Sequence, residues 1–159
     1  MKIKCYAFVN DEELEAPFLE YLQQKYTPPE NESDKDRERR VSKIISVREH
    51  ISHVAERKGV YYIPPLVKTY KCRKIGNINE IGILKIKEGN ILIRIGFVTF
   101  GNKQEIIIFD AFDKPSLYEK AKKREVEKAE QKFVENIEDY ITDYLKNGYS
   151  LPLPNWEGL

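Results

Sequence analysis

The sequence has few of the residues that stabilise or anchor proteins outside the reducing interior of a cell. Its 159 residues include two cysteines, one methionine and one tryptophan. Cys5 and Cys72 lie far apart and match no metal-binding spacing, so we expect free thiols. No run approaches the roughly 20 apolar residues of a membrane helix, and the apolar stretch within 1–9 is too short for a signal peptide. We therefore expect a cytoplasmic protein that does not enter a membrane.

The chain also lacks an excess of charge of one sign. It has 27 Lys and Arg against 26 Asp and Glu, a net charge of +1 at pH 7. This excludes a globally basic protein, but the charges are unevenly distributed. Residues 10–32 carry one Lys against seven acids, whereas residues 66–114 carry nine Lys or Arg against five acids. A basic middle can bind a polyanion locally, and the alternative is ordinary unevenness of surface charge.

Motifs that indicate cofactors or covalent catalysis are missing. There is no Gly-rich phosphate loop and no nucleophile motif. His50 and His53 are the two histidines of the chain, and they lie three residues apart in a segment with helical spacing. With no third ligand evident near them, we interpret them as ordinary helix residues and predict neither a metal nor a cofactor.

What the sequence does contain is a succession of periodic segments that predicts one α+β domain at 1–148. A Pro-containing linker at 26–34 separates two predicted helices, and Asp34 is expected to cap the second. Two helices joined in this way are typical of a helical hairpin. The predicted elements are a strand at 2–9, helices at 16–25 and 34–58, β-rich runs at 78–87, 91–100 and 103–109, a C-terminal helix at 116–148 and a Pro/Trp tail at 149–159.

Two turns set the expected strand register. Gly89-Asn90 and Gly101-Asn102 are each typical of a two-residue type II′ hairpin, because Gly readily takes the first position with positive φ. They predict an antiparallel meander whose middle strand, 91–100, is apolar on both faces. The first turn pairs Lys85 with Arg94, and the second pairs Arg94 with Phe109.

This register predicts a basic patch. Lys85, Lys87 and Arg94 project from one face of the sheet, within about 10 Å of one another. A direct Lys–Arg pair is repulsive, and it is tolerated more readily if an anion binds there. The alternative is that both lysines are solvated and that Arg94 pairs with Glu105, which the second turn places diagonally nearby.

At this point the chain resembles the RelE/HigB toxins of the RelE/ParE superfamily, including their phage-derived HigB-like branch. The order of strand, helical hairpin and three-stranded meander is similar over roughly residues 1–25 and 40–125. The segment Lys85-Ile86-Lys87, followed by Arg94, is similar to the Lys-x-Lys…Arg arrangement of RelE. Other matching stretches are Pro65-Leu-Val-Lys68, Asn77-Ile-Asn-Glu80-Ile81, Gly89-Asn-Ile-Leu-Ile-Arg94 and Ile106-Ile-Ile-Phe-Asp-Ala-Phe112-Asp-Lys114.

The resemblance implies a toxin that is a ribosome-dependent endoribonuclease, a hydrolase that binds messenger RNA in the decoding site and is neutralised by a cognate antitoxin. It implies that Arg94 holds the phosphate and that Lys85 and Lys87 contact phosphate or transfer protons. Lys114 and Tyr118 would lie at the mouth of the site, where Tyr118 can stack on a base. Solvated Lys114 and helix-packing Tyr118 are the alternatives.

Two departures bear on activity. Gly82 stands where the HigB-like branch has the Arg of its Glu-Leu-Arg motif, so either Lys85 replaces this Arg or the contact is absent. Asp113-Lys114 stands in place of Lys-Lys. Two other functions therefore stay open: a ParE-like toxin that inhibits gyrase, and an inactive RelE-fold interaction module. A stripe on the C-terminal helix is either core or the seam of a homodimer, and its members are Val126, Ala129, Phe133, Ile137, Tyr140 and Tyr144.

Overall fold

The computed structural model describes residues 4–10, 14–56, 67–71, 80–89, 91–100, 105–115 and 120–153. It confirms the α+β class and the meander followed by a long helix. The elements are β1 (Lys4–Phe8), α1 (Pro17–Tyr26), α2 (Asp34–Glu56), β2 (Val67–Lys71), β3 (Glu80–Glu88), β4 (Ile91–Phe100), β5 (Glu105–Pro115), α3 (Lys120–Asn147) and β6 (Ser150–Pro152).

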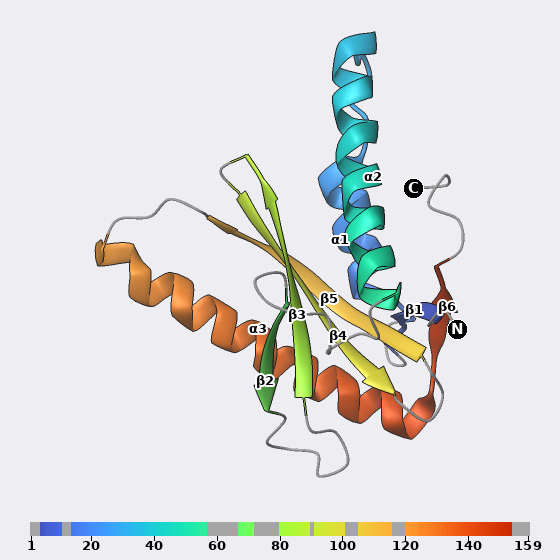
Figure 1. Ribbon diagram of the computed structural model, residues 1–159, viewed down its shortest axis with the longest axis vertical. Coiled ribbons are helices and arrows are strands. Elements are labelled where there is room, and N and C mark those ends of the chain that lie inside the picture. The colour runs from blue at the N-terminus through green and yellow to red at the C-terminus, as the bar shows by residue number, and fades with distance from the viewer. Residues whose placement is uncertain are drawn as a thin grey trace.

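The described strands form one sheet that lies between two helical layers (Figure 1). The strand order is β2-β3-β4-β5-β1-β6, with β1 parallel to β5 and the other neighbours antiparallel. One face buries Ile93 and Ile95 against α1 and α2, and the opposite face buries Ile83 and Ile107 against α3. Central strands covered on both faces need apolar side chains on both, as β4 has.

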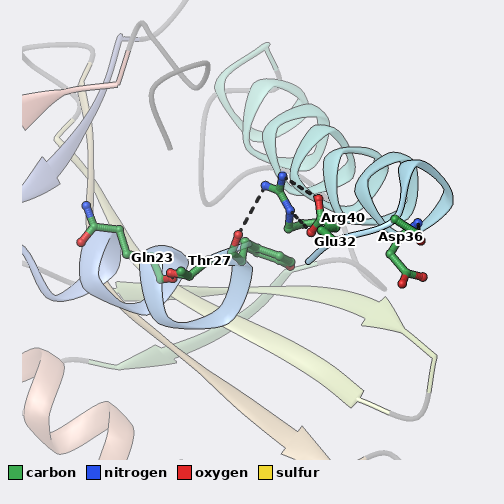
Figure 2. A network of polar contacts seen from close by, with 7 residues as sticks. Gln23, Thr27, Glu32, Asp36 and Arg40 are labelled. Atoms are coloured by element: carbon green, nitrogen blue, oxygen red, sulfur yellow. Dashed lines mark hydrogen bonds and ion pairs between the residues drawn. The ribbon is translucent and has the colours of Figure 1, made fainter. Parts of the chain in front are cut away.

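The linker between α1 and α2 is held by Arg40 (Figure 2). Its guanidinium donates to Glu32 through Nε at 2.9 Å and Nη2 at 3.1 Å, and through Nη1 to the Tyr26 carbonyl at 3.5 Å. The cap of α2 is Ser33, not Asp34 as the sequence suggested, because the Ser33 Oγ accepts from the backbone N–H of Asp36 at 3.1 Å. The serine side chain thus satisfies a first-turn N–H that the helix itself cannot.

The first hairpin is as predicted. Lys85 pairs with Arg94 and Lys87 with Leu92, and Glu88 pairs with Ile91 across a two-residue connection. Gly89 has a φ of +58°, a conformation that a residue without a Cβ adopts without strain.

The predicted register between β4 and β5 is wrong. Phe100 pairs with Glu105 and Arg94 pairs with Phe112 rather than Phe109. The connection spans four residues instead of two, and a β-bulge between Gly96 and Phe97 shifts the register once more. Glu105 therefore lies opposite Phe100, far along the strand from Arg94, and the proposed Arg94–Glu105 pair does not form.

Two strands were not predicted. β2 pairs with β3, and β6 pairs with β1 through Ala7 and Leu151 within the supposed tail. The strand β6 has three residues, too few for a periodic pattern. Trp156 of the tail and Tyr118 lie outside the described residues.

The apolar stripe of α3 is core from Phe133 onward. Phe133 and Ile137 are buried, and Tyr140 and Tyr144 pack partly buried on the same cluster. Ala129 is exposed. The homodimer through this helix stays a prediction, and it would have to use another face of α3.

Candidate anion-binding site

The face of the sheet covered by α3 divides along its length into an apolar end and a charged end. Because alternate residues share a face, the pairing of Lys85 with Arg94 and of Leu92 with Lys114 puts all three cations on the α3 side of the sheet. Lys87 shares this face and is exposed at the hairpin end.

The edge strand β2 adds two residues that the sequence analysis did not assign to the site. Lys68 pairs with Ile83 and Tyr70 with Ile81, two core residues of the α3 face. The Lys68 Nζ lies 4.8 Å from the centre of the Tyr70 ring. A hydrogen bond with Tyr70 raises the pKa of Lys68. No short turn joins β2 to β3, so only the tertiary pairing reveals that Lys68 lies near Arg94.

A buried carboxylate from α3 completes the group. Glu130 accepts a hydrogen bond from the Tyr70 hydroxyl at 2.8 Å and one from Lys114 Nζ at 2.8 Å. It is 8% exposed. We call Lys68, Tyr70, Lys85, Arg94, Lys114 and Glu130 the basic cluster.

Arg94 is the most buried cation of the basic cluster. It is 7% exposed, and its Nε has no hydrogen-bond partner among the described residues. Burial lowers the pKa of Arg94, and the negative charge of Glu130 partly opposes this. A buried N–H donor without an acceptor is destabilising unless a ligand or water satisfies it.

The protonated, positively charged form of Lys85 is also destabilised by its surroundings. Burial, then the charges of Arg94 and Lys68, lower its pKa. The structure gives its amine no ion-pair partner within the described part of the chain. A lysine with a lowered pKa holds its proton less tightly and is therefore better suited to proton transfer than a solvated one.

Glu130 does not balance these charges. Burial alone would raise its pKa, but the hydrogen bonds from Lys114 and Tyr70 outweigh burial and lower it, so Glu130 is ionised near neutral pH. Four cations then face one carboxylate, which leaves an excess of three positive charges; Arg94 is buried, Lys85 and Lys114 are half-buried, and Lys68 is exposed at the edge. Such an excess favours an anion with several acceptor oxygens, such as a phosphoryl group.

Gly82 has a structural explanation. A Cβ at this position would overlap the ring of Phe97, which lies in the core under α1 and α2. An Arg side chain has no room here, and it would leave the sheet on the side opposite to the basic cluster. Lys85, three residues further along β3, projects from the other face and does not replace it.

The remaining predicted positions contribute less. His50 Nδ1 lies 2.7 Å from the Ser46 carbonyl of its own helix. Among the described residues, no three metal-ligating side chains lie close enough together to bind a metal ion. None of the described helices is long and apolar enough to span a bilayer.

A cavity of about 460 Å³ opens on the α2 side of the molecule, behind the β3–β4 hairpin. Its cations are already paired: Lys25 with Asp113 at 2.6 Å, Arg40 with Glu32 and Lys43 with Glu88 at 3.7 Å. The full lining is Lys25, Tyr26, Thr27, Pro29, Asp36, Arg39, Arg40, Lys43 and Glu88. Unlike the basic cluster, this cavity shows no buried donor in need of a ligand, and we assign it none.

Comparisons with protein-family models, with curated proteins and with solved structures gave no match. The resemblance to RelE/HigB toxins therefore stays a prediction. The chemistry of the basic cluster stands on the contacts of this chain alone.

Proposed function

We propose that the basic cluster binds the phosphodiester backbone of RNA and that the protein is a messenger-RNA endonuclease of the RelE/HigB type. The observation that carries the proposal is the pair Lys85–Arg94. Two directly paired cations are mutually repulsive, yet they lie on a covered face, and the Arg94 Nε has no acceptor in the described part of the chain. An anion bound between them would remove both penalties.

Cleavage on this site would follow the chemistry of RNA itself. The 2′-oxygen attacks the adjacent phosphorus, the bond to the 5′-oxygen breaks, and a 2′,3′-cyclic phosphate and a free 5′-hydroxyl form. Arg94 would stabilise the extra negative charge on phosphorus, as electrostatic catalysis requires. The 2′-hydroxyl gives up a proton and the leaving oxygen gains one, and Lys85, with its lowered pKa, is the candidate for proton transfer. Lys87 would contact a flanking phosphate, and Lys114 and Tyr118 would lie at the mouth of the site, with Tyr118 stacked on a base.

The proposal includes a cytoplasmic setting, the ribosome as the place of cleavage and a cognate antitoxin as inhibitor. These follow from the resemblance. The geometry supports the phosphate-binding part of it: the cations lie together, and the described residues give neither Lys85 nor Arg94 a direct ion pair with an acid.

A second function is favoured by two observations. Glu130 already neutralises Lys114, and the position of Gly82 excludes the arginine of the HigB-like branch. Both features suit an interaction module that keeps the fold and binds a polyanion without cleaving it. A gyrase-inhibiting toxin is the third outcome that the experiment separates.

The test is controlled expression in bacteria of the wild-type chain and of the double variant Lys85→Met/Arg94→Met, with message ends mapped by primer extension. We expect cleavage within translated messages for the wild type and none for the double variant. The matched control is Lys128→Met/Lys132→Met, which removes two exposed cations from α3 outside the basic cluster and should leave cleavage intact.

If messenger RNAs stay intact in cells that express the folded wild-type chain, the proposed nuclease activity is contradicted. Growth arrest would then indicate a target such as gyrase, and normal growth a binding module. Cleavage that persists in the folded double variant would place the active site elsewhere.

A further inference from the structure

The Glu130 carboxylate is a negatively charged group that lies within the proposed anion-binding site. It lies on α3, whereas the four cations come from three strands of the meander and from β2. Glu130 is hydrogen-bonded to Lys114, and its charge also acts on Arg94 and, more weakly, on Lys68 and Lys85. A single carboxylate that interacts with every cation of the group lies among them, which is where a phosphoryl group would bind.

The hydrogen bonds of Glu130 are those that a phosphoryl oxygen would accept. One carboxylate oxygen takes the Tyr70 hydroxyl and the other takes Lys114 Nζ. A carboxylate and the phosphodiester of RNA each present two charged oxygens, and each phosphodiester oxygen can accept more than one hydrogen bond, which leaves an acceptor for the Arg94 Nε. A ligand phosphate would therefore satisfy the donors that Glu130 holds and also the donor that Glu130 leaves unpaired.

Glu130 also lies at the boundary between the anchored and the unanchored part of α3. The residues after it include buried Phe133, Val134 and Ile137, whereas residues 123–129 are exposed apart from half-buried Val126. The helix runs past the hairpin end of the sheet, and its first turns project away from the strands (Figure 1). A modest shift of this end of α3 can withdraw the carboxylate while the apolar core stays packed.

We propose that the Glu130 carboxylate occupies the subsite of a ligand phosphoryl group and competes with that group for Lys114 and Tyr70. This inference rests on the proposed binding of RNA phosphates by the basic cluster. It makes Glu130 a determinant of affinity: RNA binds by displacing a side chain of the protein itself.

The experiment measures binding of a short fluorescein-labelled oligoribonucleotide and of inorganic phosphate to the full chain and to Glu130→Gln. Glutamine keeps the shape and can hydrogen-bond, but it loses the charge that competes. We expect at least about a tenfold gain in affinity for both probes, because a unit charge a few ångströms away in a partly buried site has an effect of that size or larger.

The matched control is Glu127→Gln, one turn earlier on the same helix and exposed. It changes the net charge equally and should change affinity by less than about twofold, since exposed charges are screened. Glu130→Asp is the second variant, which keeps the charge but draws the carboxylate back from Tyr70 and Lys114. It should bind with intermediate affinity, and it keeps the test decisive if the glutamine variant does not fold.

Affinity that is unchanged or weaker in folded Glu130→Gln would overturn the inference, since Glu130 would then position the cations rather than compete. The proposed function would still stand if the wild type binds RNA. Absence of binding by the wild type and by every folded variant would instead overturn the RNA-binding proposal, and this inference with it.

Discussion

The two ends of the sheet face beneath α3 share strands β3, β4 and β5 and are covered by the same helix, yet they are stabilised differently. At one end Phe8 packs with its ring centre 5.2 Å from that of Phe109 and 5.1 Å from that of Tyr140. At the other end Arg94 and Lys85 replace the apolar side chains. The apolar end contributes stability through burial, whereas the charged end keeps an excess of positive charge that burial disfavours. Buried charge that is not balanced is expected at functional sites more often than in a structural core.

The largest expected effect is at the apolar end. Ile137→Ala should lower the free energy of unfolding by about 2–5 kcal/mol, because Ile137 is fully buried and its loss leaves a cavity next to Gly96. Phosphate affinity of the folded variant should stay within about twofold of wild type. Urea unfolding and phosphate titration measure the two quantities, and a parallel loss of both would show that the two ends are not independent.

Asp110, which pairs with Gly96, lies between the two ends on β5. Burial raises its pKa to about 6, although a hydrogen bond from the Ala111 N–H partly opposes this. The folded state then holds the proton more tightly than the unfolded state. The resulting stability is fully present below the unfolded pKa near 3.8 and is lost as pH rises through about 6.

Asp110→Asn should therefore flatten the pH dependence of stability. The wild type should lose up to about 3 kcal/mol more than the variant between about pH 4 and pH 7, since one pKa unit corresponds to about 1.4 kcal/mol. Urea unfolding across this range measures the difference. Parallel curves for the two proteins would mean that Asp110 titrates normally.

The smallest effect on stability is expected at the charged end. A substitution there separates the two regions most clearly, because it should change phosphate binding and leave stability nearly unchanged. Arg94→Met should leave the free energy of unfolding unchanged or raise it by about 1 kcal/mol, because an apolar side chain of similar length replaces a buried cation whose Nε is unpaired. Phosphate binding should fall by at least about tenfold, as expected for loss of a charge-assisted contact.

Lys132→Met removes an exposed cation from α3 and serves as the control for Arg94→Met, with both properties expected near wild type. If Arg94→Met loses stability and retains phosphate binding, Arg94 is a structural residue rather than a ligand-binding one.

Local patterns were sufficient where a short turn or a regular period specified the geometry. Alternation and the Gly89-Asn90 turn predicted β3, β4 and the pairing of Lys85 with Arg94, since a two-residue connection leaves one register. The same reasoning failed one strand later. A bulge lies beside Gly96, where Ile137 and Phe133 of α3 pack so closely that a Cβ has no room. No turn motif encodes these features.

The sequence by itself determined the α+β class, the hairpin and the basic character of its face, because these depend on periodicity and on residues close together in the chain. Only the tertiary structure decided which residues complete the site. Lys68, Tyr70 and Glu130 come from an edge strand and a helix distant in sequence, and they meet Arg94 because non-local pairing and helix packing bring them there. Charge balance in a buried group depends on such contacts, and a pattern of nearby residues cannot specify it.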